Sequence, residues 1–237
     1  CNYSYSAFNV EYKINPSVNF NGVMVELKSQ PKNSSATIIH TETDAGIPIT
    51  FYDAPFLVTS NVKLLLVAFP MPNPTMLKLE FNKATGKKII LKNPPSPKYQ
   101  GDGAFTLVNG IKGDLAAGWS GNEWLGFLGN DLEATIDLGA NDTISKVTAG
   151  FLTDKLSWIH PPKTFEVLIS QDGNNFKSVG KIKFDTNNSS RTENTIEFNK
   201  TVVRYVKVIA DPVDKIPEGN PGVGKLGWLF VDEISIE

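Results

Sequence analysis

The sequence is poor in the side chains that enzymes most often use for nucleophilic and metal-dependent catalysis. Its 237 residues include one cysteine, Cys1, and two histidines, His40 and His160. A single cysteine can form no disulfide within the chain and rules out a zinc cluster built on cysteines. The two histidines lie far apart in the sequence and accompany no recognisable triad of serine or cysteine with an acid. The sequence therefore predicts no catalytic residue.

Long hydrophobic runs and an excess of basic charge are also missing. The longest apolar run, 62–69, is interrupted by Lys63 and is far shorter than the roughly 20 residues that span a membrane. The 23 basic and 25 acidic residues give a formal net charge of −2, and no basic stripe or tail occurs. We therefore expect neither a membrane span nor nucleic acid as a partner.

Helical periodicity is absent as well, and short runs rich in β-branched and aromatic residues take its place. These runs have the length of strands, and turn sequences such as Asp-Gly-Asn at 172–174 separate them. Many short strands with regular turns are typical of β-sandwiches. The runs lie at 23–27, 62–69, 88–91, 134–138, 164–169 and 202–209.

The length and pattern predict an all-β protein with two β-sandwich domains. At 237 residues, the chain can hold one large or two modest domains. We place the boundary near Phe81 and Asn82, with a small sandwich over 1–81 and a larger one over 82–237.

From Asn82 onward, the sequence resembles the discoidin-type domain, also called the coagulation factor 5/8 type C domain. The likeness implies a galactose-binding-like jelly roll, as in family 32 carbohydrate-binding modules, and ligands of the N-acetylglucosamine or galactose type. The matching segments are 107–110, Trp119, 136–139, 144–147, 170–176, 204–208 and 232–234.

The first domain resembles the small β-sandwich that follows the catalytic barrel in bacterial β-N-acetylhexosaminidases of glycoside hydrolase family 20. Its matching segments are 36–41, 52–56 and 62–69, with a similar junction at 82–87. Those enzymes use an adjacent Asp-Glu pair on a barrel strand. Here the one such pair, Asp232-Glu233, opens the last predicted strand, and a barrel takes about 250 residues. The resemblance thus implies an accessory region without enzyme activity, whose partner is a catalytic domain of the same polypeptide.

Tryptophans near predicted loops are the first candidates for sugar binding, because a flat indole can stack on the C–H face of a sugar ring. We select Trp124, Trp158 and Trp228 for this role. Packing at the end of the sandwich is the open alternative for each of them. For Trp119, the resemblance implies a side chain that faces the core.

Two further residues could bind sugar hydroxyls. His160 follows Trp158 in a loop whose backbone is fixed by Pro161 and Pro162, and its ring can donate or accept a hydrogen bond; a structural histidine is the alternative. Arg191 follows the polar stretch 185–190 and offers a rigid fork for paired oxygens; a solvated surface arginine is the alternative.

The resemblance also implies a structural calcium ion, shared by the loop after the first strand and a glutamate on the last strand. Glu233 matches the position of that glutamate, and Asn109 and Asp114 match the loop. Calcium takes six to eight oxygen ligands, including carboxylates and backbone carbonyls. Gly118 stands where related domains carry a threonine.

These features together predict a carbohydrate-binding accessory module of an exported glycoside hydrolase that targets or braces the catalytic domain. Two alternatives stay open: a pair of bracing sandwiches that binds no sugar, and a fragment of a β-N-acetylhexosaminidase whose barrel lies elsewhere. We expect a periplasmic or cell-surface location. Cys1 is either an arbitrary first residue or the lipid-modified cysteine of a bacterial lipoprotein.

Overall fold

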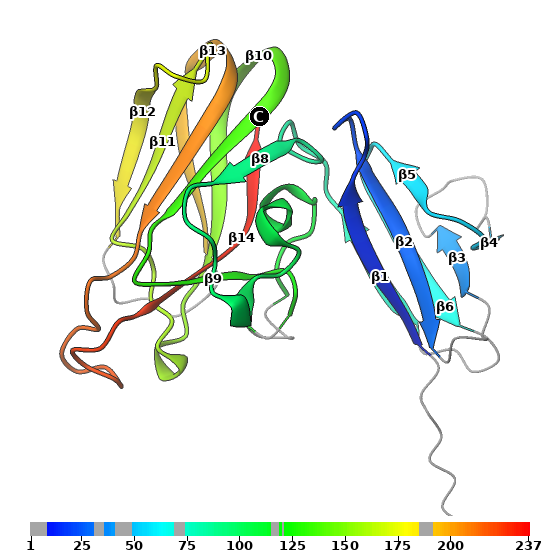
Figure 1. Cartoon of the computed structure of the whole chain (residues 1–237), viewed down its shortest axis with the longest axis horizontal. Helices are drawn as coiled ribbons and strands as arrows, with labels where there is room; N and C mark the ends of the chain where they lie inside the picture. The colour runs from blue at the N-terminus through cyan, green and yellow to red at the C-terminus, as the bar shows by residue number, and fades with distance from the viewer. Residues whose placement is uncertain are drawn as a thin grey trace, which may run out of the picture. The chain divides into compact units, whose positions relative to one another are not determined.

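The computed structural model describes residues 9–30, 36–40, 49–68, 74–114, 119, 121–184 and 192–237 of the chain. The chain forms two compact units, Cys1–Phe81 and Asn82–Glu237, and both are built of strands (Figure 1). This confirms the predicted all-β fold class. The described part of the chain contains no helix that is long and apolar enough to cross a membrane.

The first unit consists of two antiparallel sheets. Contacts of β1 with β6 and β7 join the sheets, and the Thr75 hydroxyl donates a hydrogen bond to the Val10 carbonyl over 3.1 Å. Leu64, Leu66 and Leu77 are buried between them. One sheet has the order β1 (Asn9–Pro16), β2 (Val23–Gln30), β5 (Phe56–Val58), and the other β4 (Ile49–Phe51), β3 (Ala36–His40), β6 (Val62–Ala68), β7 (Thr75–Leu79).

The second unit is a larger antiparallel sheet with the strand order β12-β11-β13-β10-β14-β9, and β8 pairs with β10. The last strand, β14, therefore lies inside the sheet between β10 and β9 (Figure 1). The strands are β8 (Lys88–Leu91), β9 (Leu125–Leu128), β10 (Leu132–Leu152), β11 (Thr164–Ser170), β12 (Lys177–Lys183), β13 (Thr192–Asp211) and β14 (Trp228–Ile236), and the 3-10 turns are η1 (Pro97–Tyr99), η2 (Gly103–Val108) and η4 (Lys155–Ser157).

Two long strands, β10 and β13, give this unit its shape. They pair along most of their length, with a register shift between Asp137 and Asp142. Before the shift β10 pairs with β8, and after it with β14. Gly139 adopts a φ of 87° at the bend, a conformation that favours glycine. Arg204 holds the bend by two hydrogen bonds to the Asp137 carboxylate, of 2.8 and 2.9 Å.

The bend lets the strands enclose one hydrophobic core. Residues from β9, β10, β11, β13 and β14 are fully buried in it. Phe151 lies near its centre, with its ring 5.6 Å from that of Phe165 and 5.9 Å from that of Phe184, both edge to face. Such aromatic pairs add to the stabilisation that comes from buried area alone.

The predicted strands at 88–91 and 164–169 are confirmed, since β8 and β11 occupy those positions. The runs at 134–138 and 202–209 are parts of much longer strands, of 21 and 20 residues. The sequence Leu-Gly at 138–139, which predicts a strand end, instead forms the bend within β10.

Candidate functional site

A cluster of aromatic side chains lies at one end of the second unit. Tyr99, from η1, is at its centre, with its ring 5.6 Å from Trp119, 5.1 Å from Trp228 and 4.9 Å from Phe230. Trp228 and Phe230 come from β14, at the far end of the sequence. The cluster therefore joins loops and strands that are widely separated in the chain. We refer to these four residues as the aromatic cluster.

Trp158 lies on the turn that follows η4, and its side chain reaches solvent. It is 38% exposed, so part of its indole is open to a ligand. Its backbone is left-handed, with φ 63° and ψ 21°. This conformation costs an L-residue about 1–2 kcal/mol, and such strain is found most often where a site needs it.

The surroundings of Trp158 hold its indole in place. A Cβ atom at Gly222 would come within 2.5 Å of the Trp158 Cε2 atom, so the ring packs directly on the backbone of Gly222. The Trp228 N–H donates a 2.8 Å hydrogen bond to the Trp158 carbonyl. The predicted platform residue is thus both partly exposed and fixed in orientation.

His160, two residues further on, is buried, with 1% of its surface exposed. Its backbone N–H donates to the Trp228 carbonyl over 2.9 Å. Neither ring nitrogen has a hydrogen-bond partner among the described residues. Burial, and secondarily the charge of Lys155, lowers the pKa of the imidazole below its usual 6.5. The ring does not reach the surface, so the structure places His160 as the alternative had it, as a buried histidine, and shows no route by which it contacts a sugar hydroxyl.

The other sugar-binding candidates differ in their placement. Trp124 is only 1% exposed, and its ring packs on Gly113, where no Cβ atom would fit. Its indole is therefore packed inside the end of the sandwich, which is the alternative given for Trp124, and only its edge lines the cavity described next. Trp228 is half-buried in the aromatic cluster. Arg191 lies outside the described residues.

A cavity of about 400 Å³ opens beside the aromatic cluster. Tyr99, Trp119 and Trp124 contribute aromatic surface to it, and Gln100 and Asn122 contribute amides. Sequence reasoning missed Tyr99, Gln100 and Asn122 as site residues. The one signal for them is the proline-rich excursion at 94–97, which precedes Tyr99.

Hydrogen bonds connect this cavity to the turn that carries Trp158. The Trp119 Nε1–H donates to the Ser157 hydroxyl over 3.2 Å, and that hydroxyl donates to Asp154 Oδ2 over 2.6 Å. Ser157 directly precedes Trp158. The cavity and the exposed indole therefore belong to one end of the unit and share one structural turn.

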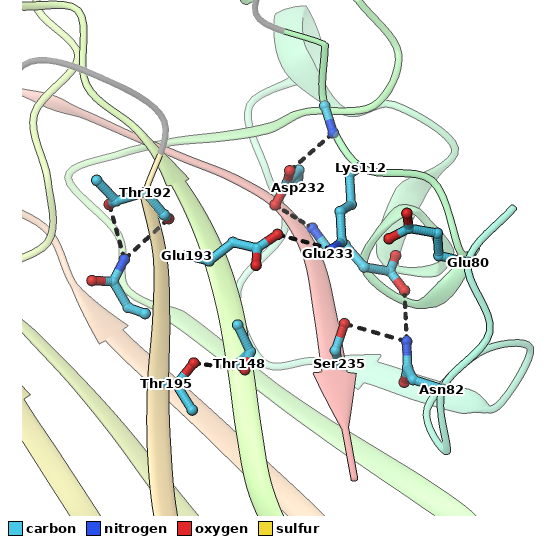
Figure 2. Close-up of polar contacts among 12 residues, drawn as sticks. Glu80, Asn82, Lys112, Thr148, Thr192, Glu193, Thr195, Asp232, Glu233 and Ser235 are labelled. Carbon is cyan, nitrogen blue, oxygen red and sulfur yellow. Dashed lines mark hydrogen bonds and ion pairs between the residues drawn. The ribbon is translucent and has the colours of Figure 1, made fainter. Parts of the chain in front are cut away.

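Asp232 and Glu233 form a buried acidic pair at the centre of β14 (Figure 2). Gly113 donates its N–H to Asp232 Oδ2 over 2.9 Å, and Gly110 donates to Glu233 Oε2 over 3.3 Å. The Asn82 amide lies 3.5 Å from Glu233 Oε1. Burial, together with the negative charge of Asp232, raises the pKa of Glu233 well above its usual value.

The structure brings only some of the three predicted calcium ligands close together. Glu233 lies against the loop of Asn109, as predicted, but the Asn109 side-chain oxygen accepts a 2.8 Å hydrogen bond from the Ile111 N–H. Asp114 is exposed. The described part of the chain holds no group of three or more His, Cys, Asp and Glu suited to a metal. Because burial favours the protonated form of Glu233, a cation here would have to displace that proton, and it would need backbone carbonyls in addition to Glu233.

Comparison with known proteins identifies the fold of the second unit. Residues 110–208 match the family model of the NedA-like, galactose-binding F5/8 type C domain. Together with the strand order, this shows a discoidin-type, galactose-binding-like jelly roll, as predicted. No curated protein matches the sequence.

Several solved structures are similar to the chain. Chitosan-binding module 1 of a chitosanase/glucanase from Paenibacillus sp. IK-5 has 13% identity and a TM-score of 0.43, over 67% of this chain and 99% of that one. The Clostridium perfringens module CpGH89CBM32-5, in complex with GalNAc-β-1,3-galactose, has 21% identity and a TM-score of 0.41, over 63% and 93%. A Streptococcus pneumoniae fucose binding module, SpX-3, has 16% identity and a TM-score of 0.41, over 66% and 97%.

Proposed function

We propose that the chain is a non-catalytic carbohydrate-binding region whose second unit binds glycans at the end that carries Trp158. The observation that carries this proposal is the geometry of Trp158: an indole 38% exposed on a left-handed backbone, packed against a glycine. A bulky residue rarely adopts this backbone conformation. Among the described residues, Trp158 belongs neither to the main hydrophobic core nor to the aromatic cluster.

Carbohydrate binding accounts for these features chemically. A sugar ring presents a flat C–H face that stacks on an indole, and a ring held rigidly loses little conformational freedom when it binds. The galactose-binding family model at 110–208 supports the same class of ligand. We propose ligands of the N-acetylglucosamine or galactose type. A few stacked rings and exposed hydrogen bonds give modest affinity after the costs of ordering.

The wider context follows from the resemblance of the first 81 residues to a hexosaminidase accessory domain. We propose that the chain belongs to an exported glycoside hydrolase and holds its catalytic domain near glycan. A periplasmic or cell-surface location, and a lipid anchor at Cys1, are parts of this proposal. Cys1 lies outside the described residues. Because the catalytic Asp-Glu pair would lie elsewhere, the chain alone should hydrolyse no aryl N-acetylhexosaminide.

A bracing function without sugar binding is the second candidate. It is favoured by the burial of Trp124 and His160, two of the five residues selected as sugar ligands. In that case the aromatic end would serve only to pack loops together, and the exposure of Trp158 would have no consequence for binding.

A glycan array followed by titration calorimetry separates these candidates. The wild-type chain is compared with Trp158→Ala, and Leu156→Ala is the matched control because it changes an 83% exposed apolar residue on the same turn. Sugar binding predicts a saturable signal that Trp158→Ala removes and Leu156→Ala keeps, with both variants folded by circular dichroism. No binding to any glycan at millimolar concentration would refute sugar binding and leave the bracing function.

A further inference from the structure

We propose that the cavity lined by η1, Trp119, Asn122 and Trp124 is a second saccharide subsite beside Trp158, so that the unit takes an oligosaccharide rather than a single sugar. This inference rests on the proposed function and concerns the same end of the unit. It adds a ligand site formed by Tyr99, Gln100, Trp119 and Asn122, which sequence patterns do not indicate.

The size and the lining of the cavity suit one sugar residue. Its volume of about 400 Å³ falls in the range of about 300–1,000 Å³ that small-molecule sites occupy. Tyr99 and Trp119 supply aromatic surface, while Gln100 and Asn122 are exposed at its rim. An amide offers two donors and an acceptor, which matches hydroxyl groups that both donate and accept.

The rim amides are exposed, and the floor of the cavity is fixed. Neither the Gln100 nor the Asn122 side chain has a hydrogen-bond partner within the part of the chain that the structure describes. Tyr99, by contrast, is fixed: its N–H donates to the Ser96 carbonyl over 2.8 Å, and its Cβ lies where a side chain at Gly126 would clash. A preformed floor with free polar groups above it is the usual arrangement of a binding pocket.

The described lining offers a ligand mainly aromatic rings and uncharged polar groups. Among the lining residues that the structure describes, the charged one is Lys98, whose ammonium lies 5.1 Å from the centre of the Tyr99 ring in a cation–π contact. The other polar groups of the described lining are the amides of Gln100 and Asn122, the Tyr99 hydroxyl and the indole N–H groups of Trp119 and Trp124. Hydroxyl and N-acetyl groups, which hydrogen-bond without a counter-charge, are therefore the groups that this cavity recognises.

The subsite adjoins the Trp158 platform through a continuous set of contacts. Trp119 lines the cavity and donates to Ser157, the residue before Trp158. A glycan stacked on Trp158 can therefore extend along the same turn toward Tyr99. Two linked subsites raise the affinity for an oligosaccharide above that for its component sugar, because the second contact becomes intramolecular.

Titration calorimetry on the whole chain tests the subsite with four probes: galactose, N-acetylglucosamine, N-acetyllactosamine and tri-N-acetylchitotriose. The wild type should bind one of the oligosaccharides at least about tenfold more tightly than its component sugars. The double variant Gln100→Ala/Asn122→Ala should weaken that oligosaccharide by about fivefold to tenfold and leave monosaccharide affinity unchanged. Trp158→Ala should weaken every probe. Asn199→Ala, which removes an exposed amide outside the cavity lining, is the matched control.

The outcomes separate this inference from the proposed function. Equal affinity for mono- and oligosaccharides, or an amide double variant that binds the oligosaccharide like the wild type, would overturn the subsite while sugar binding stands. An oligosaccharide that binds without detectable monosaccharide binding, and is weakened by the double variant, supports the subsite. If no probe binds and the glycan array is blank, sugar binding itself fails, and the subsite fails with it.

Discussion

Replacing Trp158 by glycine and by alanine separates the two contributions of this residue to stability. The first is the packing of its indole on Gly222, and the second is the strain of its left-handed backbone, at φ 63°. Alanine removes the ring but keeps the strain. Glycine removes both, because it adopts positive φ without a steric penalty.

The structure sets the size of each effect. A fully buried large apolar side chain contributes about 1.5–3 kcal/mol. Because Trp158 is 38% exposed, Trp158→Ala should lower the free energy of unfolding by about 1–2 kcal/mol. The left-handed conformation costs alanine about 1–2 kcal/mol, and the larger chain entropy of unfolded glycine offsets part of this. Trp158→Gly should therefore be more stable than Trp158→Ala by about 1 kcal/mol.

Urea denaturation measures the difference in stability between the glycine and the alanine variant. Followed by tryptophan fluorescence, it reports on the unfolding of the second unit alone. All four tryptophans lie after residue 82, at positions 119, 124, 158 and 228, and three remain in each variant. Both variants should lose sugar binding alike. A glycine variant equal to or less stable than the alanine variant would show that the backbone at 158 is unstrained, and would remove the main support for a functional role of its conformation.

Three other predictions follow from buried groups. Burial lowers the pKa of His160 below 6.5, so below that pH the unfolded state binds more protons than the folded state. The free energy of unfolding should therefore fall as the pH drops through 6.5, and it should fall less steeply in His160→Leu than in the wild type. Urea midpoints that change in parallel in both proteins between pH 8 and 5 would contradict this. Calcium at 100 times its Kd should stabilise the second unit by about 2.7 kcal/mol. This stabilisation should appear as a rise in Tm of the wild type that Glu233→Gln abolishes. Equal rises in Tm in the wild type and in Glu233→Gln would exclude Glu233 as a ligand. Ile136→Ala should lower the free energy of unfolding by about 2–5 kcal/mol, because Ile136 is 0% exposed, whereas Ile90→Ala should lower it by about 0.5 kcal/mol or less, because Ile90 is 60% exposed. Similar urea midpoints in the two variants would contradict the placement of Ile136 in the core.

Much of the fold could be predicted from the sequence, because its signals are local. Runs of β-branched residues such as 88–91 and 164–169 became strands β8 and β11. The long strands could not be anticipated, because the residues that bend them resemble turns. Gly139 breaks the apolar pattern of β10 as a loop residue would, yet pairing with β13 continues beyond it.

The candidate site could be predicted less well, because burial at the end of a sandwich depends on distant residues. For Trp158 the sequence left open whether the indole stacks on a sugar or packs at the end of the sandwich, and in the structure it is 38% exposed. Trp124 was chosen as a tryptophan near a loop and His160 as a neighbour of Trp158, but Gly113 packs on the Trp124 ring and Gly227 lies close to the His160 ring. The cavity at Tyr99 combines segments about 20 residues apart, Pro97–Tyr99 and 119–124, and no local pattern indicates such a combination.

The position of β14 inside its sheet governs how the second unit can be made. The strand that lies between β10 and β9 is the last part of the unit to be synthesised, and its end is tied to the start by the Lys83 N–H, which donates to the Ile236 carbonyl over 3.0 Å. Contacts between residues so far apart in sequence form slowly. The edges of β9 and β10 that pair with β14 therefore stay unpaired until residues 228–236 join the sheet, and unpaired edges of this kind favour aggregation during folding.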